Sequence, residues 1–333
     1  MDIRNRRAIR DTAAQSLASA PGEPRKTALV YAGGTALLGL LTTVITSLVG
    51  RQIDSTGGLG NMGLRSMLET VQYILPLVQS VIVLCIGFGY SAAVLRMARR
   101  QETAPRTLLD GFRHFGPLVR MTILEGLIYI AIAFVTLYLS AQIFVMTPLA
   151  DGFWEIMMPV VSSTTVLDSA MVLDDATLFA ASEAMIPMIP IFLVLFLVAA
   201  APIYYQYRMA TFALLDNPRQ GAFAAMRARR TMMQKNRFSL FKLDLGFWWF
   251  YLAELVIGLL AYGDTLLPLL GVSFPWSDTF SYYLFYVVSL GLQVGLYYLF
   301  LNRVNTTYAT AYEALRPKPQ QTNTVVLGNI FEM

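Results

Sequence analysis

The sequence predicts an all-α membrane protein in which six helices span the bilayer. Of its 333 residues, 56% are hydrophobic and 14% are charged, whereas about 25% of the residues in soluble domains are charged. The mean hydropathy is +0.55. Several uninterrupted apolar runs are longer than the roughly 20 residues that a spanning helix needs. The chain is therefore too poor in polar residues to cover itself as a globule in water.

The apolar runs place the six spans in order along the chain. The expected spans cover about residues 27–50, 71–95, 118–147, 186–212, 239–262 and 280–302. They define a membrane domain over 27–316, which follows a basic N-terminal segment, 1–26, and precedes a flexible polar tail, 317–333. No cleavable signal peptide is expected, because the first apolar run has span length and follows a long polar segment.

Lys and Arg are concentrated in alternate connections. Of the 25, six precede the first span, six lie in 96–120, eight lie in 208–242 and three follow the last span, whereas two lie in 51–69. The positive-inside rule then predicts that both termini are cytoplasmic. Because basic residues at this surface attract anionic headgroups, membrane lipids are the expected partners. Nucleic acid is not expected, since no nucleic-acid-binding motif accompanies the charge.

Each of the two long basic connections is expected to form an amphipathic helix at the inner membrane surface. In TAPRTLLDGFRHFGP, the apolar face would carry Leu108, Leu109, Phe112 and Phe115, and the polar face Arg106, Asp110 and Arg113. We expect Gly116-Pro117 to end this helix.

In the second connection, Asn217 is expected to cap a helix that has Pro218 at its first position and Gln220 in an approximate capping box. An apolar stripe would follow, formed by Phe223, Met226 and Met233 and interrupted by Arg230. The basic residues expected to contact lipid headgroups or a partner protein are Arg227, Arg229, Arg230, Lys235 and Arg237.

A weak internal repeat indicates three in–out–in hairpins of the same orientation. Arg-Met-Ala occurs at 96–98 and again at 208–210, after the second and fourth spans, and Asn302-Arg303 takes the matching place after the sixth. Parallel repeats of this kind are known among transporters.

Charged residues within spans are the default functional candidates, because each costs about 2.5–3.5 kcal/mol at a helix centre. The candidates are Glu254 near the middle of span five, Glu125 in span three, Asp244 at the inner end of span five and Arg208 at the inner end of span four. Glu254 could carry protons or cations. The alternative, which we favour, is a buried acid that bonds a polar neighbour such as Gln293. Arg208 is expected to pair with Glu125 or Asp244.

Pro202 lies in the interior of span four and Pro76 in that of span two, and each should kink its helix. Small residues that allow close helix packing are Gly33, Gly34, Gly39, Gly87, Gly89, Gly291 and Gly295. The chain has one Cys, Cys85, and one His, His114, so neither a disulfide framework nor a Cys/His metal site is expected.

The connection 148–185 carries six acids and no basic residue: Asp151, Glu155, Asp168, Asp174, Asp175 and Glu183. Their scattered spacing differs from that of cation-binding loops, and we expect a solvated cap, helical in part from Asp174 onward. No Walker loop, GxGxxG, HExxH or Ser/His/Asp set is present. We therefore expect no enzymatic activity, no cofactor and no metal.

The stretch YRMATFALLDNPRQGAFAAMRARRTMMQKNRFSLFKLDLGFWW resembles the signature of bacterial integral membrane proteins grouped as domain-of-unknown-function family 975. LRMARRQETAPRTLLDGFRHFGPLVR and NRVNTTYATAYEAL are similar to that family's first cytoplasmic connection and C-terminal helix. The resemblance covers about residues 27–316 and is specific around 204–250. It implies six spans and a bacterial inner membrane, and the family brings no catalytic residues.

Three functional hypotheses follow. The leading one is a non-enzymatic membrane protein whose basic inner face binds anionic lipid or a partner protein. The second is a small-solute or proton-coupled ion transporter that uses the kink in span four and Glu254. The third is an accessory subunit of a larger membrane assembly, or a homo-oligomer, joined through the face of Gly291 and Gly295.

Overall fold

The computed structural model describes residues 5–55, 62–163, 175–218, 221–233, 236–269, 271–272 and 275–316. The described part of the chain is helical and contains no strand beyond an isolated bridge between Gly22 and Thr103. It divides into two compact units, of which the first combines Met1–Phe112 with Phe238–Met333 and the second is Arg113–Arg237.

The first unit contains the two ends of the chain's helical part. Its elements are α1 (Arg6–Ser19), α2 (Pro24–Ser55), α3 (Met62–Ala98), the 3₁₀ turn η2 (Pro105–Leu109), α4 (Asp110–Arg113), α11 (Arg237–Asp244), the 3₁₀ turn η5 (Leu245–Phe247), α12 (Trp248–Leu260), α13 (Gly263–Leu269), α14 (Asp278–Leu296), the π-helix η6 (Tyr297–Leu301) and α15 (Asn302–Leu315).

The second unit lies between them in sequence. Its elements are α5 (Phe115–Val145), the 3₁₀ turn η3 (Pro148–Ala150), α6 (Asp151–Ser163), α7 (Asp175–Ala184), α8 (Met188–Tyr207), α9 (Ala210–Asp216) and α10 (Gly221–Met233).

The prediction of six membrane-spanning helices is confirmed. Helical stretches that are long and apolar enough to cross a bilayer run over Pro24–Ile53, Gly63–Ala98, Phe115–Val145, Met188–Asp216, Arg237–Leu260 and Thr279–Leu315. The last one exceeds its expected span most, because the polar residues of α15 continue the helix after the apolar run ends.

Large apolar side chains on these helices are exposed within the structure. Leu77, Phe134 and Val198 expose 65%, 69% and 68% of their surface. Water would make such exposure unfavourable, whereas hydrocarbon is as apolar as the side chains themselves. The exposed surfaces of the spanning helices therefore suit a bilayer, and this explains how so hydrophobic a chain has so small an interior core.

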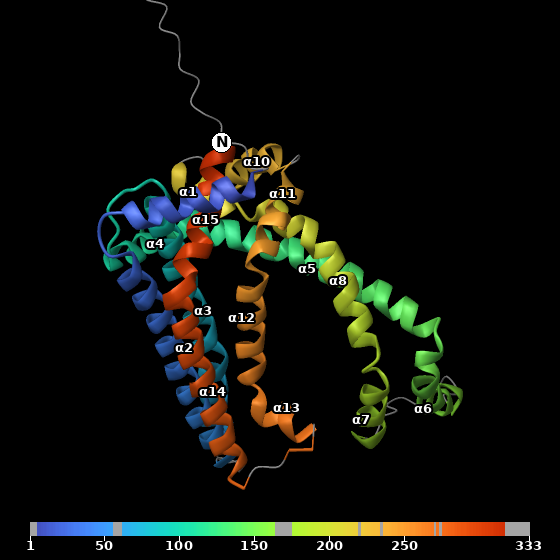
Figure 1. The fold of residues 1–333 in the computed structure, drawn as a ribbon. Coiled ribbons are helices and arrows are strands. Elements are labelled where there is room, and N and C mark those ends of the chain that lie inside the picture. Colours follow the sequence, from blue (N-terminus) through green and yellow to red (C-terminus); the bar gives the residue numbers. More distant parts are fainter. Residues whose placement is uncertain are drawn as a thin grey trace, which may run out of the picture. The chain divides into compact units, whose positions relative to one another are not determined.

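In the first unit, α2 packs along α3, and α14 lies beside α2 and α12. The end of this unit formed by α1, the start of α2, the end of α3 and α15 is called the basic end below. There α1 packs against α15 and α3, across the end of the bundle (Figure 1). The N-terminal segment, predicted only as basic, thus contributes a helix to the packing.

α15 is the centre of the basic end. Its side chains are buried on most sides by α1, α2 and α3, and Ala309 and Ala311 are fully covered. From α1, Ile9 and Ala13 enter the same core with 0% and 2% exposure. Their spacing of four residues places them on one face of the helix, and burying an isoleucine side chain contributes about 1.5–3 kcal/mol.

Glycines divide into packed and open positions. A Cβ added to Gly89 of α3 would collide with the backbone oxygen of Leu108, and one added to Gly111 of α4 with that of Cys85. These two glycines allow α3 and the η2–α4 segment to touch backbone to backbone. At a second group of glycines, no described residue packs closely, because a Cβ would meet nothing within 4 Å: Gly33, Gly34, Gly291 and Gly295.

The expected amphipathic helix of the first basic connection is replaced by the short elements η2 and α4. Leu108 is buried, whereas Leu109 and Phe112 are exposed, so the predicted apolar face does not pack as one surface. The expectation that Gly116-Pro117 ends a helix is also wrong. Both residues lie in the first turn of α5, where proline is tolerated because the first N–H groups have no helical partner.

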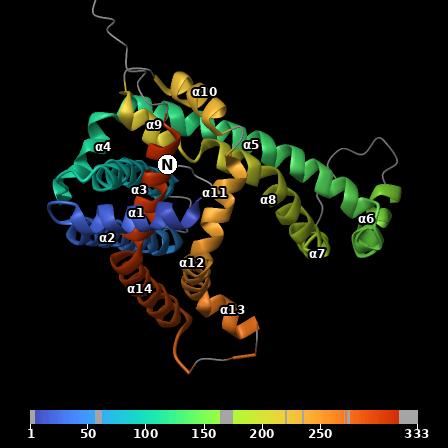
Figure 2. The ribbon, with the colours of Figure 1, turned by 45° about the horizontal axis from the view of Figure 1, so that its top comes forward.

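In the second unit, α5 packs along α8, and α10 packs against both (Figure 2). Asn217 is the C-cap of α9 and donates its backbone N–H to the carbonyl of Ala213, whereas Gln220 lies outside the described residues, so the capping box after Asn217 stays a prediction. Phe223 of α10 is exposed, whereas Met233 is buried. The acidic connection is helical at both ends, in α6 and α7, of which the second was expected. Three of its acids, Asp151, Glu155 and Glu183, are exposed, whereas Asp168 and Asp174 lie outside the described residues.

Candidate functional site

The most unusual backbone in the first unit is the π-helix η6, which follows α14 without a break and leads directly into α15. π-helical turns are rare and concentrate at functional sites. Before the turn, the N–H of Tyr297 is shared between the carbonyls of Gln293 and Val294. The segment is aromatic, since Tyr297 stacks with Phe250 at a centroid distance of 6.3 Å.

The intramembrane acid Glu254 lies against this turn. The Tyr297 hydroxyl lies beside the Glu254 carboxylate, and the side-chain amide of Gln293 donates to that hydroxyl at 3.4 Å. Glu254 is half-buried. Gln293 and Tyr297 are four residues apart and share one helix face. The predicted neighbour Gln293 therefore belongs to the Glu254 cluster, but the group beside the acid is Tyr297, which the sequence did not indicate.

A second polar group joins α2, α3 and α15 just beyond η6. The Tyr90 hydroxyl donates to the side-chain oxygen of Asn302 at 2.7 Å, and the amide nitrogen of Asn302 donates to the carbonyl of Pro24 at 2.8 Å. The ring of Tyr31 stacks on Tyr90 with centroids 4.4 Å apart. Asn302, identified from the sequence only as part of a repeat, thus holds the start of the first span to the end of the last.

Asp244 takes part in a third group. The Tyr308 hydroxyl donates to the Asp244 carboxylate at 2.5 Å, and the hydroxyls of Tyr251 and Tyr308 are 2.7 Å apart. Because Tyr308 uses its proton on Asp244, Tyr251 is the donor of the second bond. The expected pairing of this acid with Arg208 stays a prediction. Lys242 lies over the ring of Phe238, with its Nζ 4.4 Å from the centroid.

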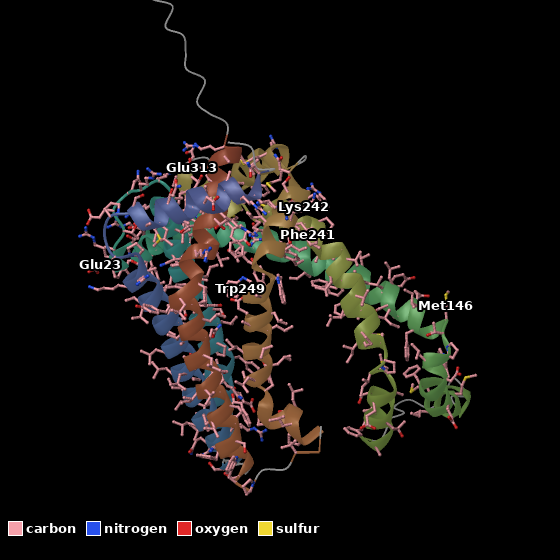
Figure 3. The ribbon with its side chains drawn as sticks, viewed as in Figure 1. Glu23, Met146, Phe241, Lys242, Trp249 and Glu313 are labelled. Carbon is pink, nitrogen blue, oxygen red and sulfur yellow. The ribbon has the colours of Figure 1, made fainter. Side chains whose placement is uncertain are left out.

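Two arginines of α1 reach the same region. A guanidinium nitrogen of Arg6 donates to the carbonyl of Lys242 at 3.2 Å, and one of Arg10 lies 3.5 Å from the carbonyl of Leu243. Arg10 also lies over the ring of Phe247. The break between α11 and η5 leaves these carbonyls available, and α1 supplies donors for them. Figure 3 shows Lys242 and Phe241 at this corner and Trp249 farther along the span. The sequence indicated no partner for these arginines.

Other basic side chains at the basic end form ion pairs within the protein. Arg96, from the first Arg-Met-Ala segment, bonds Asp110 at 2.8 Å and the Thr107 hydroxyl at 3.2 Å. Arg99 bonds the Glu313 carboxylate at 2.7 Å, near the end of α15 in Figure 3. These contacts join α3 to η2, α4 and α15.

In the second unit, Arg227 lines a groove between α5, α8 and α10 with a cavity volume of about 480 Å³. The other residues around the groove are apolar or aromatic: Leu124, Leu127, Ile128, Ala131, Tyr207, Phe223 and Met226. Arg237 donates to the Gln206 side chain at 2.6 Å and is thus used within the protein. Lys235 and the side chains of Arg229 and Arg230 lie outside the described residues.

The remaining candidates are placed as follows. Arg208 lies over the Tyr204 ring at 5.2 Å, and its pairing with Glu125 in span three stays a prediction. Pro202 is inside α8 and Pro76 inside α3, as expected. Among the residues that the structure describes, no three His, Cys, Asp or Glu side chains are grouped so that they could hold a metal ion.

Comparison with known proteins gives one match. The model of a family described as "Protein of unknown function (DUF975)" matches residues 25–317. No curated protein and no solved structure matches the chain.

Proposed function

We propose that this chain, which belongs to the family "Protein of unknown function (DUF975)", is a non-enzymatic membrane protein that binds anionic phospholipid. The observation that carries the proposal is the groove of the second unit, in which Arg227 accompanies seven apolar or aromatic residues. Two of the three helices around the groove, α5 and α8, are long and apolar enough to cross a membrane, which supports contact with lipid. The proposed location is the inner membrane of a bacterium, with the basic surfaces and both termini in the cytoplasm.

The composition of the groove favours an amphiphile with a negative headgroup. Its walls offer an acyl chain contact with the leucines and isoleucine of α5 and with Phe223 and Met226 of α10. Arg227 is exposed, and its guanidinium has no partner among the residues that the structure describes. A basic residue near an anionic membrane surface contributes about 1 kcal/mol, and guanidinium matches phosphate geometry with paired hydrogen bonds.

The lipid proposal is tested by native mass spectrometry of detergent-purified protein titrated with phosphatidylglycerol or phosphatidylcholine. We expect phosphatidylglycerol to be preferred, and Arg227→Gln to weaken that binding about fivefold. Neutralising Arg229 and Arg230 as well should weaken it further. Arg51→Gln is the matched control, because Arg51 is an exposed arginine near the far end of α2. Equal retention of the two lipids, or unchanged binding by Arg227→Gln, would contradict the proposal.

Transport of protons or small cations is the second candidate. It is favoured by the combination of a π-helical turn with a half-buried acid, Glu254, that lies beside a tyrosine of that turn. A carboxyl group next to backbone that departs from α-helical bonding is typical of ion pathways. In this reading Glu254 carries the proton or cation, and Tyr297 orients the carboxyl group.

The transport candidate is tested by proton or cation flux into proteoliposomes. Glu254→Gln should abolish the flux, whereas Tyr297→Phe should reduce it, because the acid remains but loses the polar group beside it. Glu155→Gln is the control, since this exposed acid lies in α6 outside the spans. Flux that is equal in Glu254→Gln and in the unmodified protein excludes this candidate.

A further inference from the structure

A groove in the first unit has a cavity volume of about 680 Å³, within the range of roughly 300–1,000 Å³ that is usual for ligand sites. One wall is the C-terminal half of α1, and the other consists of η6 and the start of α15. The turn between α1 and α2 and the first turn of α2 close it at one end. Figure 3 shows Glu23 at that turn.

The turn is fixed in place by a short bridge to the α3–η2 connection. The backbone N–H of Glu23 donates to the carbonyl of Thr103 at 2.8 Å, and the N–H of Thr103 donates to the carbonyl of Pro21 at 3.1 Å. Between them, Gly22 adopts φ +96° and touches the Thr103 backbone, which only glycine permits. The opposite wall is fixed by Asn302, which is 5% exposed and donates to the carbonyl of Pro24.

The groove carries an excess of positive charge. Arg25, Lys26 and Arg303 line it together with a single acid, Glu23, and that acid pairs with Lys26 at 2.5 Å. The guanidinium groups of Arg25 and Arg303 have no partner within the described ranges, and both residues are exposed. Two guanidiniums, from the first and last spanning helices, are therefore available to one ligand.

Apolar surface adjoins these charges. Leu299 of η6 lines the groove and is 65% exposed, and Tyr298 beside it is 38% exposed. On α2, Leu29 and Val30 follow Arg25 and Lys26 and are exposed as well. The basic groove and the apolar surface next to it are complementary to a phospholipid. The basic residues suit the phosphate, and the apolar surface of the two spanning helices suits the acyl chains that adjoin it.

We propose that this groove binds the phosphate of an anionic phospholipid, with Arg25 and Arg303 as its ligands and the acyl chains along Leu299 and α2. The site is separate from the groove of Arg227 and does not rest on it. α2 begins at Pro24, which lines the groove, so the positive end of the helix dipole adds to the attraction for phosphate. A lipid bound here bridges the first and last spans at the point where η6 meets α15.

A cysteine placed in the groove reports its occupancy. Ala18→Cys introduces a thiol at an exposed position in the groove, and the native Cys85 is 0% exposed. In detergent, we expect phosphatidylglycerol to slow alkylation of this thiol several-fold, and phosphatidylcholine or inorganic phosphate to leave it unchanged. Gln15→Cys is the control, because it is exposed on α1 but does not line the groove.

Charge variants complete the test. Combined with Ala18→Cys, Arg25→Gln and Arg303→Gln should each raise the phosphatidylglycerol concentration needed for protection about fivefold, whereas Arg51→Gln should not. Arg227→Gln should also leave the protection intact, which separates this site from the groove of the second unit. Equal protection by phosphatidylcholine, protection by phosphate alone, or protection that survives both arginine substitutions overturns the proposal.

Discussion

At the scale of single residues, identical amino acids have opposite roles according to what they face. Gly89 and Gly111 are contact points between backbones, whereas Gly291 and Gly295 face open space. The spacing Gly-x-x-x-Gly marks the second pair as a packing motif, yet the first pair carries the packing within the described structure. A spacing rule identifies a smooth helix face but not the partner that covers it.

Substitution at Gly89 should therefore destabilise the protein, and substitution at Gly291 should not. Gly89→Ala forces α3 away from Leu108, and overpacking of this kind costs about 1–3 kcal/mol. Gly291→Ala adds a methyl group in open space and removes backbone freedom from the unfolded chain. Thermal unfolding in detergent measures both. A lower midpoint for Gly291→Ala than for Gly89→Ala would contradict the assignment.

The Tyr308 hydroxyl serves two partners, Asp244 and Tyr251. Tyr308→Phe removes both hydrogen bonds while the ring still fills its place, so we expect a loss of about 1–3 kcal/mol of stability. Tyr73→Phe is the control, because Tyr73 is 75% exposed. Denaturant unfolding followed by Trp fluorescence checks the difference between the two variants, and equal stability would exclude a role for the bond to Asp244.

The sequence identified Glu254 correctly as an acid within a span but could not choose its partner. Gln293 and Tyr297 lie on the same face of the last span, one helical turn apart, and both can donate to a carboxylate. Only the relative height of α12 and α14 decides between them. That height depends on which apolar side chains of the two helices touch. A span made almost entirely of apolar residues does not show which of them do.

At the scale of elements, lengths were predictable and local backbone geometry was not. Apolar runs define the spans because bilayer thickness fixes the length that a helix needs. The π-helix η6 has no such signature, since α and π turns differ only in which carbonyl accepts each N–H. α1 was overlooked because a polar segment with few apolar residues resembles a loop. Its apolar residues, Ile9 and Ala13, become meaningful only against the face of α15.

The docking of α1 can be tested through Ile9. Ile9→Ala removes a fully buried side chain and should cost about 2–5 kcal/mol, enough to free α1 from α15. Arg6 and Arg10 would then lose their carbonyl partners and become accessible to trypsin. Limited proteolysis should show faster cleavage than in Gln15→Ala, which changes an exposed position of the same helix. Unchanged cleavage would mean that the arginine contacts alone hold the helix.

At the scale of the whole molecule, four spanning helices belong to the first unit and two to the second. The first unit brings the two ends of the helical chain together, as α1 packs on α15. This division was not visible in the sequence, which showed three similar hairpins. Hydrophobicity directs helices into lipid but does not select their neighbours, because lipid and apolar side chains are equivalent surroundings for a leucine.

The proposed orientation predicts which positions are accessible from each side of the membrane. With Cys85 replaced by Ser, Val272→Cys should react with an impermeant thiol reagent outside the cell. Ser19→Cys, at the end of α1, should react only after permeabilisation. Both positions are exposed, so a lack of labelling at either one would not be due to burial of the thiol. The reverse labelling pattern would place the termini outside and would contradict the positive-inside assignment.

The π-helical turn has a consequence for insertions and deletions. A π turn amounts to an α-helix with one additional residue, so deleting one residue from η6 would restore regular α-helical winding. Every later residue would then rotate by about 100° about the helix axis relative to the preceding span. Asn302 and Tyr308 would leave their partners on α2, α3 and α11 together. The one additional residue thus sets how far the buried end of the last helix, α15, is rotated about the helix axis relative to its lipid-facing part, α14. Insertions and deletions should therefore be tolerated in the connecting loops but not between Tyr297 and Leu301.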